Sequence, residues 1–179
     1  MKIIVINGKP RAGKDLFVTK CQQHLLWCKN ISTVDFVKTI ASRCGWDGTK
    51  SPKNRAFLSD LKDLLSNWDD VPFKKTRQAA ELYESEAATY DFPTEDVLVF
   101  IHCREPHEIQ RFVDEMNAQT LLMRRATVED AEQSNHADSE VFQYNYDYII
   151  NNDGTEEELE QKAIEFLKTI GFEKQLTNL

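Results

Sequence analysis

The sequence lacks the features of a membrane protein, an exported protein or a metal-bound cysteine fold. No apolar run approaches the roughly 18 residues that a membrane span needs. The apolar stretch Ile3–Ile6 is ended by Asn7 and Gly8, too early for a signal peptide. The four cysteines form neither a C-x-x-C pair nor a zinc-binding spacing. We therefore expect a cytoplasmic protein with reduced thiols and no membrane partner.

Acidic residues outnumber basic ones, 30 to 22. The net charge is −8, which disfavours general binding to nucleic acid. The charge is uneven, because basic residues outnumber acidic ones between Lys38 and Arg77 and acidic ones dominate from Ala126 to the end. The basic stretch suits a phosphorylated substrate, but two solvated helix faces of opposite sign would explain the same pattern.

Strand and helix patterns alternate along the chain, without internal repeats or low-complexity linkers. This alternation predicts an α/β fold with a five-stranded parallel sheet in a single domain. The continuous apolar run of the first strand is typical of a strand buried on both faces. The predicted strands are 3–6, 31–34, 97–101, 120–123 and 146–150. The predicted helices are about 13–29, 35–44, one opened by Ser51-Pro52, 73–89, 105–116 and 155–170, with a loose tail after Gly171.

The most specific motif is G-x-x-x-x-G-K, from Gly8 through Lys14. It follows a predicted strand and opens a predicted helix, which is the context that a phosphate-binding loop requires. Its glycines allow the backbone to turn N–H groups toward phosphate oxygens, and the helix N-terminus adds partial positive charge. Lys14 would reach the transferred phosphate. The predicted ATP-binding residues are Gly8, Lys9, Arg11, Ala12, Gly13, Lys14, Asp15 and Leu16.

Asp15 departs from this motif, which usually has Ser or Thr as a magnesium ligand at that position. A carboxylate is also a hard oxygen ligand, so Asp15 would bind Mg²⁺ directly or through water. Its other explanation is a favourable charge in the first turn of the helix. ATP and Mg²⁺ are the expected cofactors.

The loop from Gly8 to Asp15 resembles that of phage-type deoxynucleoside monophosphate kinases and of animal-type phosphomevalonate kinases. Further segments are similar to stretches of the nucleoside monophosphate kinases, namely 34–38, 44–50, 55–61, 99–104 and 147–155. The resemblance implies a three-layer P-loop NTPase fold, with a helical acceptor-binding insert at about 36–92 and a short lid at about 126–145. It also implies phosphoryl transfer from ATP to a small phosphorylated acceptor, foremost a nucleoside or deoxynucleoside monophosphate.

Several residues become candidates for catalysis and acceptor binding. Arg104 and Arg124 follow predicted buried strands, and ligands of open α/β sheets bind at that strand end, where a guanidinium can grip a phosphate. A salt bridge or a surface position explains either arginine equally simply. Asp35 would orient the acceptor or cap its helix. The candidate catalytic residues are Lys14, Arg104 and Arg124, and those for the acceptor are Asp35, Arg43, Arg55 and Arg104.

Two departures from the resembled family favour another class of function. His102 stands where the family usually has an aspartate, and the segment from Ala126 to Tyr146 contains no lysine or arginine. Either Glu105 replaces the missing carboxylate, or the chain is a nucleotide-binding regulatory module with little turnover. A kinase for another phosphorylated metabolite, such as phosphomevalonate, is the third hypothesis. The guanine motif of GTPases and the signature motif of ABC-type ATPases are both absent.

Overall fold

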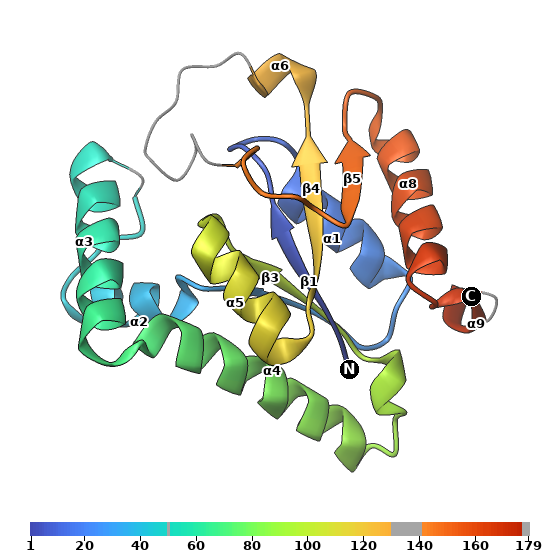
Figure 1. Cartoon of the computed structure of the whole chain (residues 1–179), viewed down its shortest axis with the longest axis horizontal. Helices are drawn as coiled ribbons and strands as arrows, with labels where there is room; N and C mark the ends of the chain where they lie inside the picture. Colours follow the sequence, from blue (N-terminus) through green and yellow to red (C-terminus); the bar gives the residue numbers. More distant parts are fainter. Residues whose placement is uncertain (50, 130–140, 177–179) are drawn as a thin grey trace.

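Five parallel strands form one sheet in the order β2-β3-β1-β4-β5, with β1 at its centre (Figure 1). The computed structural model describes residues 1–49, 51–129 and 141–176. The strands are β1 (Lys2–Asn7), β2 (Cys28–Ser32), β3 (Leu98–His102), β4 (Gln119–Arg124) and β5 (Tyr148–Asn151). This arrangement confirms the predicted α/β fold with a five-stranded parallel sheet.

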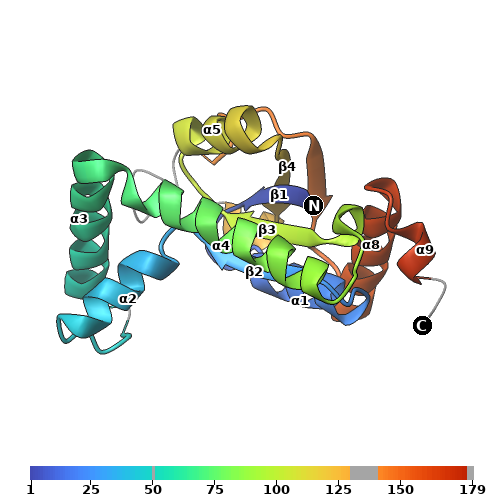
Figure 2. The same ribbon diagram turned by 90° about the horizontal axis from the view of Figure 1, so that it is seen from below.

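Alternate residues of β1 enter two separate cores, one on each face of the sheet. Ile4 and Ile6 join the core under α1 (Lys14–Gln23) and α8 (Glu156–Thr169). Ile3 and Val5 join the core under α4 (Val71–Thr89) and α5 (Pro106–Met116). Figure 2 shows α5 on one side of the sheet and α1 with α8 on the other. The apolar run of β1 is therefore explained by burial on both faces.

The chain between β2 and β3 forms α2 (Asp35–Arg43), α3 (Pro52–Asp69), α4 and the short turn η1 (Thr94–Asp96). α3 projects from the sheet at the end of the long helix α4 (Figures 1 and 2). As predicted, Ser51 caps α3, because its hydroxyl accepts a hydrogen bond from the Asn54 amide at 3.2 Å. No residue of α3 is buried, so its apolar residues do not belong to either core. They are Phe57, Leu58, Leu61, Leu64 and Leu65.

Two sequence predictions about element boundaries were wrong. The first helix ends at Gln23, not near Lys29, and β2 begins at Cys28, three positions before the predicted strand. β2 is an edge strand with exposed Lys29 and Asn30, so its sequence has no long apolar run to identify it. Cys21 of α1 and Cys28 of β2 are both buried.

The tail after Gly171 is not loose through residue 176. Phe172 is buried in the core beside α8, and the short helix α9 (Glu173–Leu176) follows it. Another short helix, α6 (Ala126–Glu129), follows β4, while most of the predicted lid, residues 130–140, lies outside the described residues. None of the helices in the described ranges has the length and apolarity to cross a membrane.

Candidate active site

The loop between β1 and α1 has the tight backbone that the glycine motif predicts. Gly8 and Gly13 have φ angles of 148° and 94°, a region that favours glycine. A Cβ atom on Gly8 would lie 2.4 Å from the Met123 carbonyl oxygen. The loop curls around Lys14, whose Nζ donates to the carbonyl oxygens of Gly8 at 2.5 Å and Lys9 at 3.0 Å. These two hydrogen bonds hold the Lys14 ammonium group against the backbone of the loop.

Two buried asparagines fix this loop to the rest of the sheet. Asn7 accepts a hydrogen bond from the Gly8 amide at 2.8 Å and donates to the Arg104 carbonyl oxygen at 3.1 Å. Asn152, just after β5, donates to the Ala12 carbonyl oxygen at 3.0 Å. The sequence reasoning did not identify Asn7, although a polar residue that ends a buried strand is a usable signal.

A cavity of about 610 Å³ opens where the loop, the ends of β2 and β3, and helices α2 and α3 meet. It contains four of the predicted site residues, Lys14, Asp15, Asp35 and Arg104. The other charged or polar side chains that line it are Asn30, Ser32, Thr33, Lys38, Ser59, Lys62, His102 and Glu105. Lys14 and Asp15, at the end of the glycine loop, form part of one wall of this cavity.

His102 and Asp15 face one another across the mouth of the loop. The distance from His102 Nε2 to Asp15 Oδ1 is 3.6 Å, and the Asp15 side chain is 91% exposed. Burial lowers the pKa of His102 to about 4, an effect that nearby Asp15 opposes and Lys14 reinforces. The imidazole is therefore neutral at pH 7. Its Nε2 is buried and has no hydrogen-bond partner among the described residues.

The structure separates the predicted arginines. Arg104 is exposed and lines the cavity at the carboxyl end of β3, as the strand-end argument predicts. Arg124 does not line this cavity. The guanidinium carbon of Arg124 is 5.6 Å from the centre of the Phe142 ring, and Lys9 Nζ is 5.8 Å from the same ring. Arg124 thus stays a candidate for the donor side of the loop.

The predicted acceptor residues also divide into two groups. Asp35 lies at the start of α2, where its carboxylate accepts a hydrogen bond from the Ser32 amide at 2.8 Å and pairs with Lys38 at 3.2 Å. The predicted capping role was wrong, because Val34 is the N-cap of α2 and no side chain caps this helix. Asp35 also lines the cavity. Arg43 and Arg55 are exposed and do not line the cavity, so their acceptor role stays a prediction.

Lys62 of α3 connects the projecting helices to the start of α5. Its Nζ lies 3.1 Å from Glu105 Oε1 and 2.8 Å from Glu108 Oε2. Burial by itself would lower the pKa of Lys62, but the charge of Glu108, together with Glu105, outweighs it and the pKa is raised. Glu108 also accepts a hydrogen bond from the buried Cys103 thiol, with 3.4 Å between Sγ and Oε2. Sequence reasoning missed Glu108, because its partner lies 46 positions away.

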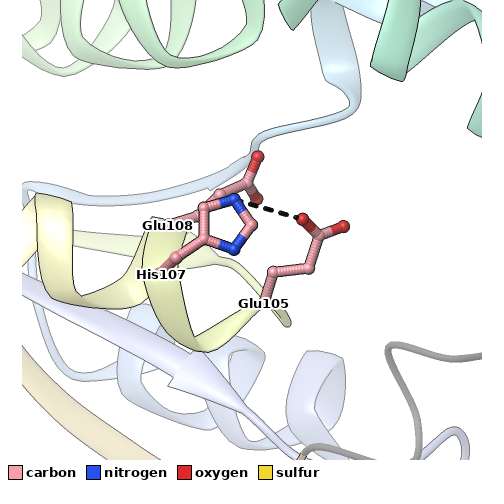
Figure 3. Close-up of side chains that lie close together, drawn as sticks. All are labelled: Glu105, His107 and Glu108. Atoms are coloured by element: carbon pink, nitrogen blue, oxygen red, sulfur yellow. Dashed lines mark ion pairs between the residues drawn. The ribbon is translucent and has the colours of Figure 1, made fainter.

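Glu105, His107 and Glu108 resemble a metal cluster in composition (Figure 3), with ligand atoms within 4.8 Å of one another. The His107 ring points toward Glu105, at 3.6 Å between Nε2 and Oε2. However, the Lys62 ammonium already contacts both carboxylates and supplies the positive charge there. We therefore assign this cluster to the attachment of α3 and not to a metal.

No protein-family model matches the sequence, and no curated protein is significantly similar to it. Among solved structures, the chain is similar to an APS kinase of Mycobacterium tuberculosis, with 13% identity and a TM-score of 0.44 over 93% of this chain and 96% of that one. It is also similar to a sugar kinase of Janibacter, with 14% identity and a TM-score of 0.48 over 94% and 95%.

A third similar structure is the dephospho-CoA kinase of Campylobacter jejuni. It has 14% identity and a TM-score of 0.46, over 94% of this chain and 97% of that one. Similarities at this level say nothing of a shared substrate. The function of the chain has to be argued from its own residues.

Proposed function

We propose that the protein transfers the γ-phosphoryl group of ATP to a small phosphorylated acceptor, a nucleoside or deoxynucleoside monophosphate. One observation carries this proposal: the phosphate loop and the strand-end Arg104 line the same cavity, next to the helices that follow β2. A donor on the loop and an acceptor held by Arg104 would then share one space. Such closeness converts a bimolecular reaction into an effectively unimolecular one.

The residues of the loop would bind the donor. The backbone N–H groups from Gly8 to Lys14 and the N-terminus of α1 suit phosphate oxygens. Lys14 already lies inside the loop, bonded to two carbonyl oxygens, and would exchange these for phosphate oxygens when ATP binds. Its charge would follow the phosphoryl group during transfer. Arg124 and Lys9, which flank the Phe142 ring, would add charge on the donor side.

The donor set fits a divalent cation next to the loop. Asp15 is the first residue after Lys14, its carboxylate is exposed, and it lines the cavity. When bound, the cation would neutralise phosphate charge. The residues of the chain would hold it through the Asp15 carboxylate, directly or through water.

On the acceptor side, Arg104 would hold the acceptor phosphate with parallel hydrogen bonds. Lys38 and Lys62 bring further positive charge to the cavity, although each is paired with a carboxylate. A base and sugar would occupy the side formed by α2 and α3, where Leu58 and Val34 give apolar surface. This is why we favour a nucleotide over a smaller acceptor.

An acceptor screen tests the proposal. ADP formation would be measured with each common nucleoside and deoxynucleoside monophosphate, with mevalonate phosphate, and without acceptor. We expect acceptor-dependent ADP formation with at least one monophosphate. Activity with mevalonate phosphate alone would replace the acceptor class. Tight ATP binding with no acceptor-dependent turnover in the whole panel would favour the regulatory module, which His102 at the usual aspartate position also suggests.

A further inference from the structure

One side-chain nitrogen of His102, Nε2, makes no hydrogen bond within the described residues. This atom is buried and lies 3.6 Å from Asp15 Oδ1. The side chain is 16% exposed and stands at the end of β3, opposite the first turn of α1. A buried polar group without a partner is costly, so it needs an explanation.

The charges around His102 come from two helices. Lys14 and Asp15 of α1 and Asp35 and Lys38 of α2 face it across the cavity. The positive charges of the two lysines and the negative charges of the two carboxylates offset one another. The unpartnered Nε2 atom of His102 thus lies next to the carboxylate that would hold the cation.

We propose that Asp15 and His102 together form the cation site, and that this site prefers Mn²⁺ to Mg²⁺. The inference rests on the proposed function, because the cation would accompany ATP on the loop. A cation bonded to each donor at about 2.1 Å spans up to about 4.2 Å between them. The observed 3.6 Å between His102 Nε2 and Asp15 Oδ1 is within this span.

The preference follows from the ligand types. Mg²⁺ binds almost only oxygen ligands and keeps several waters. Divalent transition-metal ions accept imidazole nitrogen more readily than Mg²⁺ does. Asp15 with phosphate oxygens would serve either ion. The His102 nitrogen would add affinity only for Mn²⁺, the softer of the two ions. The sequence departure at position 102, from aspartate to histidine, would thus change the metal and leave the phosphate chemistry intact.

The test is electron spin echo spectroscopy of Mn²⁺ bound to the intact protein with a non-hydrolysable ATP analogue. We expect modulation of the echo by a directly bound ¹⁴N nucleus. The same complex, prepared from protein with ¹⁵N-histidine and an unlabelled nucleotide, is expected to lose it. This label needs no mutation and excludes the adenine nitrogens as the source. A signal without ¹⁴N modulation, or one that the ¹⁵N label does not change, would overturn the proposal.

Variants then assign the nitrogen. His102→Asn is expected to abolish the modulation and weaken Mn²⁺ binding by at least about tenfold, with Mg²⁺ affinity changed less than twofold. His107→Asn, an exposed histidine five positions away, is the matched control and should retain both. Equal losses for Mn²⁺ and Mg²⁺ would contradict the preference. If the analogue itself fails to bind, the proposed function fails, whereas bound analogue without histidine coordination defeats only this inference.

Discussion

Substitution of Gly13 by alanine provides a quantitative test of the loop geometry. The residue has a φ angle of 94°, and an added Cβ would lie 2.1 Å from the side-chain nitrogen of Asn152. A left-handed backbone conformation costs an alanine about 1–2 kcal/mol. Displacement of the Asn152 amide would leave the buried Ala12 carbonyl oxygen without its hydrogen bond, at about 1–3 kcal/mol.

The two costs together predict that Gly13→Ala lowers the free energy of unfolding by about 2–5 kcal/mol. For a domain of this size, the melting temperature would fall by about 4–20 °C. Affinity for ATP should fall as well, because the loop amides would move. Urea unfolding followed by tryptophan fluorescence gives the stability, and nucleotide titration gives the affinity.

A double mutant separates the two costs. Asn152→Ala alone would lose the hydrogen bond to the Ala12 carbonyl oxygen. Gly13→Ala, made in the Asn152→Ala background, would then add only the cost of the backbone strain. The loss in the double mutant should therefore be about 1–3 kcal/mol smaller than the sum of the single losses. Additive losses would refute the reasoning, because they would mean that the two side chains do not compete for the same space.

Three further predictions concern the cavity, the projecting helices and the thiols. Arg104→Met should lower kcat/KM for the acceptor by roughly 30- to 1000-fold, which corresponds to about 2–4 kcal/mol, and a collapse of ATP affinity would instead place Arg104 on the donor side. Lys62→Met should reduce the free energy of unfolding by about 1–3 kcal/mol. Lys53→Met, at an exposed lysine on the same helix, is the control. Equal losses of stability in the two variants would refute the role of Lys62 in attaching α3. Only Cys44 should react rapidly with a thiol reagent at neutral pH, since burial raises the pKa of the other thiols, that of Cys28 to about 12; rapid labelling of a second thiol would contradict this.

The features that sequence predicted well are local ones. The apolar run Ile3–Ile6 and the spacing from Gly8 to Lys14 each depend on a few neighbouring residues, and the structure contains both elements. The edge strand β2 was misplaced because two of its five residues are exposed, so burial leaves little pattern in the sequence.

The features that sequence could not predict depend on distant partners. Asn152 meets the loop 140 positions away, and Lys62 meets Glu108 at a separation of 46. His102 was noted as a departure from the resembled family, but its unpartnered nitrogen and its closeness to Asp15 follow only from the packing of β3 against α1. Residues 130–140, where the lid was predicted, lie outside the described part of the chain.

The most direct test of phosphoryl transfer is ³¹P NMR of the protein with ATP, a divalent cation and the acceptor monophosphate found by the screen. The wild type should produce ADP together with the resonances of a new acceptor diphosphate, in equal amounts. Lys14→Ala, shown to be folded by its thermal melt, should produce neither at more than a trace of that rate. ADP with free phosphate in place of the new diphosphate, or near wild-type transfer by folded Lys14→Ala, would contradict the account.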